Sequence, residues 1–229
     1  DEVRIVADAT VSTRPIDIML CLDVSRSMNR TSTSRRGFPP GGTTIHEPPR
    51  EGSRYFELRD TIVFFLAAME EINPNAKVGL VTFGGGYGPS EYVSSPLDDD
   101  WARVPQQLTA VVSPQADHIV ETLNSYIELP ALGLGTSHFD GVGYCIDAFN
   151  GDQSSLRHVI MLSDGDQATR NERPDVRVNA QAAADNDITI HTISFGGNFS
   201  TMEDIADLTG GSNFTALSED ELREAFESL

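Results

Sequence analysis

The 229-residue chain has few cysteines, little lysine and no long apolar run. No stretch approaches the roughly 18–20 consecutive apolar residues of a membrane helix, so we expect no membrane span within it. The first residues, from Asp1 onward, lack a basic segment followed by an apolar run, and this argues against a signal peptide. Two cysteines, Cys21 and Cys145, cannot form a structural zinc site alone. They leave open two buried free thiols or one disulfide.

Positive charge is scarce. The net charge is −19, and Lys77 is the only lysine. A chain this acidic should repel phosphate backbones, so nucleic acid is not expected as a partner. The basic residues are unevenly placed, because seven of the sixteen lie between Arg26 and Arg59.

The apolar residues, 39% of the chain, are enough for a core and follow an alternating pattern. Runs typical of buried strands alternate with segments of helical spacing. This alternation predicts a single α/β domain over residues 1–229, with a doubly wound, mainly parallel six-stranded sheet and helices on both faces. The expected strand order is 3-2-1-4-5-6, with a short antiparallel third strand at the edge. The expected strands are 16–22, 77–83, 109–112, 157–162, 188–195 and 213–217, and the expected helices are 55–72, 117–129, 139–149, 173–185, 202–208 and 219–229.

Two long segments, at about 29–54 and 84–107, interrupt the alternation. The first is rich in Ser, Thr, Gly, Pro and Arg, and the second contains three consecutive glycines and the acidic run 98–100. Loops this long are uncommon in compact domains and are usually functional or disordered. The acidic run could bind calcium, although a solvated loop is the preferred interpretation.

Three oxygen-bearing side chains, Asp23, Ser25 and Ser27, directly follow the first expected strand. In open parallel sheets, ligands bind beyond the carboxyl ends of the strands. One carboxylate and two hydroxyls there suit a hard cation such as Mg²⁺. Neutral hydroxyls leave the charge of the cation incompletely cancelled, so it would attract an external carboxylate. The pattern alone is weak, because it is expected roughly 0.1–0.2 times by chance in such a chain. The serines could instead cap a helix.

Two further segments strengthen this interpretation. Residues 133–137, Gly-Leu-Gly-Thr-Ser, precede an expected helix, and residues 162–166, Leu-Ser-Asp-Gly-Asp, end a second buried strand. In order and spacing, over nearly the whole chain, the three segments resemble the von Willebrand factor A domain family, whose fold is shared with integrin inserted domains. The resemblance implies a metal-ion-dependent adhesion site for Mg²⁺, Mn²⁺ or Ca²⁺. Its ligand set would be Asp23, Ser25, Ser27, Thr136 and Asp164.

The resemblance also implies how this site works. Ser25, Ser27 and sometimes Thr136 would contact the cation, while the two aspartates would act largely through waters. A Glu or Asp carboxylate of a protein partner would fill the remaining position. The expected function is therefore cation-dependent protein binding by a domain that is monomeric in isolation, not catalysis. Arg26 departs from many family members, which have glycine there, and it is either strained or adds a positive charge beside the site.

Residues near the three loops form an expected ligand rim. His138 either lines the site or is an ordinary loop histidine, and Asp166 lacks a clear match to a ligand position. The arginines of segment 29–54 either attract an acidic partner or merely soften the net charge. The rim set is Arg26, Arg35, Arg36, Ser137, His138 and Asp166.

The alternative function is a metal-dependent phosphohydrolase. It would need a nucleophile or general base beside the cation, for which His138 and Asp166 are the nearby candidates. The chain has no phosphate-binding Gly-x-x-x-x-Gly-Lys loop, no Gly-x-Ser-x-Gly elbow and no His-Glu-x-x-His motif. Residues 7–17 faintly resemble those of A domains on bacterial surface and tight-adherence pilus proteins. This favours an extracellular or cell-envelope location.

Overall fold

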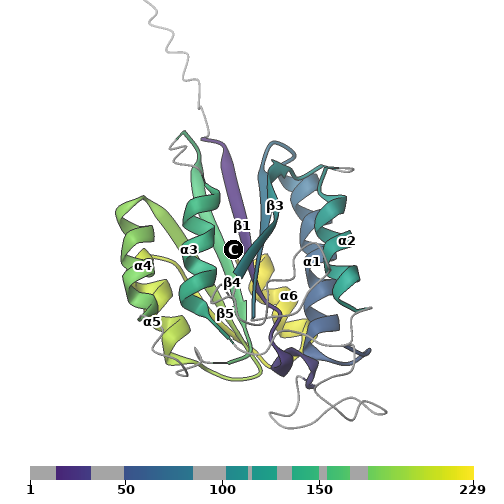
Figure 1. Cartoon of the computed structure of the whole chain (residues 1–229). Coiled ribbons are helices and arrows are strands. Elements are labelled where there is room, and N and C mark those ends of the chain that lie inside the picture. The colour runs from purple at the N-terminus through teal and green to yellow at the C-terminus, as the bar shows by residue number, and fades with distance from the viewer. Residues whose placement is uncertain are drawn as a thin grey trace, which may run out of the picture.

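The computed structural model describes residues 14–31, 49–84, 102–112, 115–127, 136–149, 154–165 and 175–229. The strands in these ranges form one six-stranded sheet between two layers of helices (Figure 1). The strands are β1 Ile16–Asp23, β2 Lys77–Phe83, β3 Ala102–Ala110, β4 Leu156–Ser163, β5 Ile188–Phe195 and β6 Asn213–Ala216. The helices are η1 Arg26–Asn29, α1 Arg54–Ile72, α2 Asp117–Ile127, α3 His138–Ala148, α4 Val176–Asp185, α5 Ser200–Thr209 and α6 Glu219–Glu227.

The sheet has the order β3-β2-β1-β4-β5-β6, which confirms the predicted topology. Strand β1 lies at its centre, where Leu20 pairs with Leu80 of β2 and Ile160 of β4, both in parallel. Only β3 runs antiparallel to its neighbour among these strands. The carboxyl ends of the parallel strands therefore lie at one edge of the sheet.

Two apolar cores, one on each face, explain the continuous apolar run of β1. Leu20 and Leu22 pack into the core under α1, α2 and α6, while Met19 and Cys21 pack into the core under α3, α4 and α5. All four side chains are 0% exposed. A strand covered on both faces buries neighbouring side chains in turn on each face, so its apolar residues need not alternate with polar ones.

The edge strand β3 corrects one expectation. It begins at residue 102 and not at 109, so the second loop ends before 102 instead of at 107. Pro105, Gln106 and Gln107 lie inside it, and its register against β2 shifts twice. Proline and polar residues are tolerated in a strand paired on one side, and the shifts break the alternation that would have revealed it. The rest of that loop, 85–101, lies outside the described residues.

Other boundaries differ from expectation by a few residues at most, as is usual for element ends. The first loop is shorter than expected, because η1 covers its beginning and α1 starts at Arg54; residues 32–48 lie outside the described residues. Cys21 and Cys145 are buried free thiols. Within the described ranges, no helix is both long enough and apolar enough to cross a membrane.

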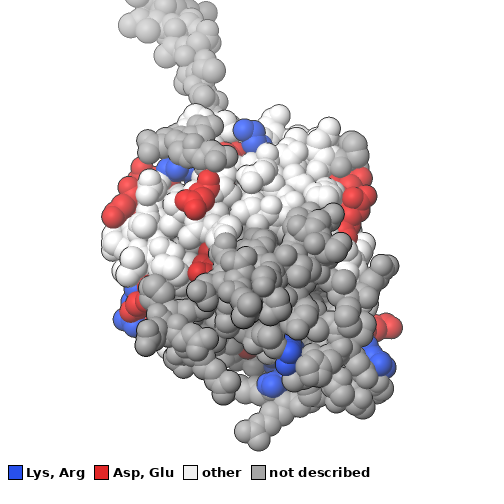
Figure 2. Space-filling view, in the orientation of Figure 1, with Lys and Arg blue, Asp and Glu red and all other residues white. Residues whose placement is uncertain are grey.

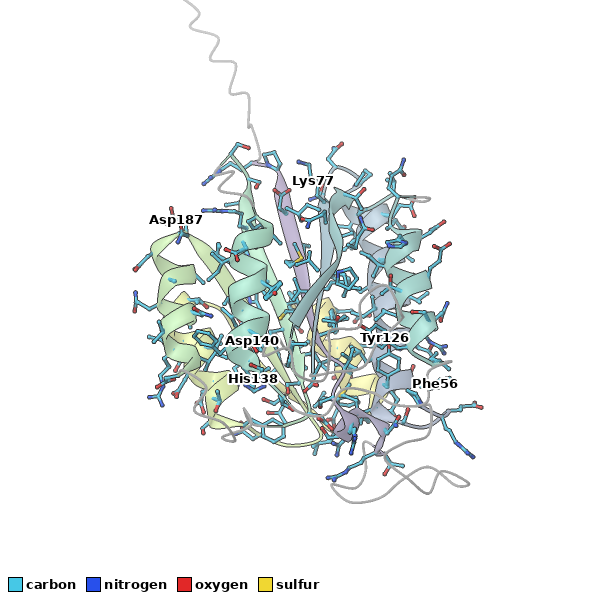
Figure 3. The ribbon with its side chains drawn as sticks, in the orientation of Figure 1. Phe56, Lys77, Tyr126, His138, Asp140 and Asp187 are labelled. Carbon is cyan, nitrogen blue, oxygen red and sulfur yellow. The ribbon has the colours of Figure 1, made fainter. Side chains whose placement is uncertain are left out.

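Acidic and basic side chains lie in different parts of the described surface. On the face drawn in Figure 2, acidic side chains lie on both flanks, and several basic ones lie toward the lower margin. That margin is the end of the molecule to which the carboxyl ends of the parallel strands point. Lys77, at the start of β2, lies far from this end, whereas His138, at the start of α3, lies near it (Figure 3).

Candidate metal centre

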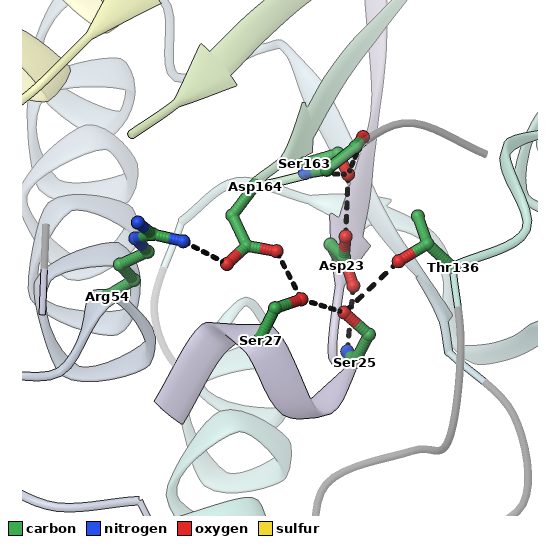
Figure 4. Close-up of polar contacts among 8 residues, drawn as sticks. Asp23, Ser25, Ser27, Arg54, Thr136, Ser163 and Asp164 are labelled. Atoms are coloured by element: carbon green, nitrogen blue, oxygen red, sulfur yellow. Dashed lines mark hydrogen bonds and ion pairs between the residues drawn. The ribbon is translucent and has the colours of Figure 1, made fainter. Parts of the chain in front are cut away.

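Three chain segments meet at the carboxyl edge of the sheet (Figure 4). Asp23 ends β1, Asp164 directly follows β4, and Thr136 lies just before α3. Because β1 and β4 are adjacent parallel strands, their ends and the loops after them lie side by side. The structure thus brings together all five side chains that the sequence proposed as a metal-ligand set.

Three hydroxyl groups form the centre of the site. The Ser25 and Ser27 Oγ atoms are 2.9 Å apart, and Thr136 Oγ1 donates to Ser25 Oγ at 3.3 Å. The short helix η1 begins at Arg26 and turns the chain, with the Met28 N–H donating to the Ser25 carbonyl at 3.0 Å. Ser25 and Thr136 are 2% and 7% exposed, so their hydroxyls are shielded from competing water.

Asp23 is the most deeply held carboxylate. Its Oδ1 accepts from the Ser25 N–H at 2.7 Å and its Oδ2 accepts from Ser163 Oγ at 2.6 Å. Burial raises the pKa of Asp23 to about 7, with a further contribution from Asp164, while the hydrogen bonds from Ser163 and Ser25 oppose the shift. A cation at the site would therefore compete with a proton for this carboxylate.

Ser163 was not identified from the sequence as a functional residue. It is the last residue of β4, is 0% exposed, and fixes the orientation of Asp23 through its hydroxyl. The available signal was its place directly before Asp164 in the third loop. That signal is weak, because a serine at a strand end is common for turn reasons alone.

Asp164 has a second partner that the sequence did not reveal. Its Oδ1 accepts from Ser27 Oγ at 2.6 Å, and its Oδ2 forms an ion pair with Arg54 Nη1. The Asp164 side chain is 0% exposed and that of Arg54 is 2% exposed. Burial raises the pKa of Asp164, and the Arg54 guanidinium and the Ser27 hydroxyl oppose that shift. No local pattern pointed to this pair, because its members are 110 residues apart.

A glycine lets the end of β2 approach the segment after β1 that carries Ser25. The Val24 N–H donates to the Phe83 carbonyl at 2.8 Å, and Gly84 follows with φ +135°. A Cβ atom on Gly84 would lie 2.8 Å from the Ser25 nitrogen, closer than real contacts allow. The backbone conformation and the close approach both require glycine here. Gly84 therefore supports the position of Ser25.

The donor set fits a hard divalent cation. Adjacent oxygens of an octahedral Mg²⁺ with bonds of about 2.1 Å lie about 3 Å apart. The 2.9 and 3.3 Å separations around Ser25 Oγ match that spacing. Over the part of the chain that the structure describes, no three His, Cys, Asp or Glu side chains gather in a metal-binding group. The centre depends on hydroxyl oxygens, with a carboxylate on either side, and this chemistry favours Mg²⁺ or Mn²⁺ over Zn²⁺.

The proposed rim residues are placed differently. Arg26 is half-buried in η1. Ser137 is 0% exposed and caps α3 by accepting from the Asp140 N–H at 3.3 Å. His138 is the first residue of α3 and not a loop residue; it is 0% exposed and its ring meets Phe83 edge-on at 5.7 Å. Ser137 and His138 are therefore not on the surface that would face a partner. Arg35, Arg36 and Asp166 lie outside the described residues.

His138 is held as a neutral imidazole. Burial lowers the pKa of His138 to about 3, and the nearby backbone of Gly165 offsets part of the shift. A base with so low a pKa carries no proton at neutral pH and accepts one only weakly. This environment does not suit a general base working near pH 7.

Known structures share the architecture. The PilB minor pilin from Streptococcus sanguinis aligns with a TM-score of 0.66 at 16% identity, over 96% of this chain and 61% of that chain. Proximal thread matrix protein 1 from the mussel byssus, solved with a zinc-occupied MIDAS motif, aligns with a TM-score of 0.63 at 18% identity, over 94% of this chain and 45% of that chain. At these identities the likeness shows the fold.

Curated relatives and a family model also match most of this chain. A UPF0353 protein of Mycolicibacterium gilvum (strain PYR-GCK) is 24% identical over 240 residues, covering 93% of this chain and 58% of the relative. The chain thus spans less than two thirds of the length of that relative. The family model for the von Willebrand factor type A domain matches residues 17–228. The chain therefore belongs to the von Willebrand factor type A domain family.

Proposed function

We propose that this domain is a divalent-cation-dependent protein-binding module that captures an acidic side chain of a partner. The observation that carries the proposal is the hydroxyl cluster of Ser25, Ser27 and Thr136, in which the two separations from Ser25 Oγ are close to that of adjacent octahedral ligands. Domains of this family are typically interaction modules. A relative of the same fold, the mussel thread protein, holds zinc at its MIDAS motif.

The charge of the site supports an acidic partner. Three of the five proposed donors are neutral hydroxyls, and only Asp23 and Asp164 carry negative charge. A divalent cation held here would remain electrophilic toward an external carboxylate. When bound, the cation supplies that electrophilic position, while Ser163 and the Ser25 N–H keep Asp23 oriented. Mg²⁺ is the proposed cation, with Mn²⁺ or Ca²⁺ as substitutes.

The setting we propose is the cell surface or envelope, with the domain monomeric in isolation. Its support is the fold shared with the streptococcal minor pilin. Arg26, which is half-buried, remains a proposed partner-facing rim residue. Arg35, Arg36 and Asp166 are proposed with it, although they lie outside the described residues.

Calorimetric titration of MgCl₂ and MnCl₂ into the wild type and Asp23→Ala tests the proposal. We expect binding by the wild type and none by the variant. Asp207→Ala, which removes an exposed carboxylate of α5, should bind as the wild type does. Equal binding by wild type and Asp23→Ala would move the cation site elsewhere, and no binding by either protein would remove the cation from the function.

For the phosphohydrolase alternative, the residues considered as catalytic base are His138 and Asp166, and Asp166 lies outside the described residues. The neutral, fully buried His138 does not fit that role. Magnesium-dependent turnover of p-nitrophenyl phosphate that disappears in Asp23→Ala would nevertheless establish it. We expect no such turnover.

A further inference from the structure

A fixed positive charge lies against the proposed cation site. Arg54, the first residue of α1, donates from Nη1 to Asp164 Oδ2, while Ser27 Oγ donates to the other oxygen of the same carboxylate at 2.6 Å (Figure 4). Arg54 and Asp164 side chains are 2% and 0% exposed. The carboxylate that would help to hold a divalent cation is therefore already shared with a monovalent one.

The backbone around Arg54 fixes it there. The Arg54 backbone N–H donates to the Arg30 carbonyl at 2.8 Å, and this hydrogen bond connects the start of α1 to the end of η1. Ser53 caps the helix by accepting from the Phe56 N–H at 3.4 Å. Neither contact uses the guanidinium, so the helix start can remain in place when that group is changed.

A glycine provides the space for the guanidinium. Gly196 follows β5 with φ +83°, and a Cβ atom there would lie 2.7 Å from Arg54 Cζ. Any larger residue at this position would displace the guanidinium from Asp164. The pairing of Arg54 with Asp164 thus depends on a third segment of the fold and is not a chance surface contact.

We propose that Arg54 is an internal counter-ion that competes with the divalent cation for Asp164, lowering metal affinity and leaving the loaded site with a surplus positive charge for an acidic partner. This inference rests on the proposed function. With Asp23 and Asp164 ionised, a divalent cation balances their two charges, and Arg54 then remains as an excess charge. In a buried site such a charge is poorly screened, so it repels the cation and attracts the carboxylate of a partner.

A structural ion pair would behave in the opposite way. If Arg54 served only to hold Asp164 in position, neutralising it would disorder the ligand set and weaken metal binding. If Arg54 competes with the cation, neutralising it strengthens metal binding. The sign of the change in Mg²⁺ affinity separates the two roles.

The test is calorimetry with MgCl₂ at about pH 8, above the pKa of about 7 of the Asp23 carboxyl, so that less metal binding is lost to protonation of that group. Arg54→Met removes the charge at similar length, and Arg54→Gln removes it while keeping a hydrogen-bond donor for Asp164. We expect both to bind Mg²⁺ at least about tenfold more tightly than the wild type. Arg54→Lys should stay close to wild type. Arg59→Met, which removes a partly buried arginine of the same helix that pairs with Asp60, should leave the affinity unchanged.

A second experiment measures how strongly the loaded site attracts a carboxylate. Acetate should displace water from the Mn²⁺-loaded wild type, as measured by water proton relaxation, at concentrations severalfold below those that Arg54→Gln requires. Circular dichroism confirms folding, and Arg54→Gln carries the test if Arg54→Met does not fold. Unchanged or weaker Mg²⁺ affinity in a folded neutral variant, with the wild type binding normally, would overturn the counter-ion role alone. Absence of binding in every protein would overturn the proposed function as well.

Discussion

Two polar clusters lie in the same apolar sheet and differ in how their polar atoms are satisfied. At the carboxyl edge, the candidate metal centre gathers two buried carboxylates and three hydroxyls, and one guanidinium, that of Arg54, contacts the Asp164 carboxylate. In the amino halves of β4 and β5, His158 and His191 meet with Nδ1 and Nε2 3.2 Å apart. The first cluster is charged and carries more negative than positive groups in contact, whereas the second is uncharged.

The two histidines form a hydrogen bond with each other. The Ser212 N–H donates to His191 Nδ1 at 3.2 Å, so the proton of that ring is on Nε2 and is donated to His158 Nδ1. The ring centres are 5.4 Å apart with planes tilted by 18°. With the nitrogens only 3.2 Å apart, such rings lie edge to edge and not face to face. Protein groups thus partner both ring nitrogens of His191 and the Nδ1 atom of His158.

The difference shows where a bound cation stabilises a fold. Burial raises the pKa of Asp23 and of Asp164, because their charged forms are costly away from water. Burial lowers the pKa of His158 and of His191, and this favours the neutral form of both imidazoles. A cation would therefore favour the ionised carboxylates of the first cluster, whereas the neutral imidazoles of the second cluster, which are hydrogen-bonded to each other, would gain nothing comparable from it. Four predictions sharpen this comparison.

The largest effect is expected from removing two hydroxyls at the centre. Ser25→Ala combined with Ser27→Ala should abolish measurable Mg²⁺ and Mn²⁺ binding in calorimetry, because two of the three hydroxyl ligands are lost. His158→Gln should bind both ions as the wild type does. Metal binding that survived the double serine variant and disappeared in His158→Gln would reverse the assignment of the two clusters.

The next effect concerns Ser163, which orients Asp23 through a 2.6 Å hydrogen bond. Ser163→Ala should weaken Mg²⁺ binding by about 10- to 100-fold, as loss of a partner that orients a ligand commonly does. The control is Ser212→Ala, since that residue contacts His191 through its backbone and its exposed side chain is not needed. An unchanged affinity in Ser163→Ala would show that Asp23 is oriented without it.

The third effect is a pH dependence of the metal-induced rise in Tm. The pKa of Asp23 is about 7 in the folded protein, against an ordinary value of 3.8. The folded state therefore holds a proton that the unfolded state has lost between these values, and this contribution to stability disappears as pH rises through 7. Metal binding must release that proton below pH 7. The Tm increase caused by Mg²⁺ should thus be small near pH 5.5 and larger near pH 8.

A calorimetric scan at both pH values, with and without MgCl₂, measures the effect. Asp23→Asn cannot titrate at this position and should show no such pH-dependent gain. A Mg²⁺-induced shift that is equal at both pH values in the wild type would mean that Asp23 is already ionised at pH 5.5.

The smallest effect is expected at the histidine pair. His158→Gln should lower the free energy of unfolding by about 0.5–1.5 kcal/mol, the usual net contribution of one hydrogen bond. The pKa of His158 is lowered in the folded state, so its contribution to stability is lost as pH falls through the ordinary value of 6.5. The variant should therefore lose less stability on acidification.

Urea unfolding at neutral and mildly acidic pH measures both parts of this prediction. His118→Gln, at an exposed position of α2, is the matched control. If Mg²⁺ changed the stability of His158→Gln by a different amount from that of the wild type, the two clusters would not be independent of each other.

Local sequence predicted much of the fold, because each central strand is covered on both faces. The runs of β1, β2 and β5 are apolar enough to mark them as strands, and their alternation with helices predicted the mainly parallel sheet that is observed. The sequence did not predict most of the edge strand β3. With one neighbour and irregular register, it tolerates proline and glutamine, so its sequence carried no clear pattern.

The clustering of the proposed ligand residues also followed from short segments, since Asp23, Ser25 and Ser27 occupy one turn after a strand whose direction is fixed by the sheet. Arg54 and Ser163 could not be found in that way. Arg54 reaches Asp164 only because α1 begins beside the metal loop and Gly196 leaves space for its guanidinium. Sequence determines which residues follow which strand; the packing of distant segments decides which charges those residues meet, because buried electrostatics depends on distance in space and not along the chain.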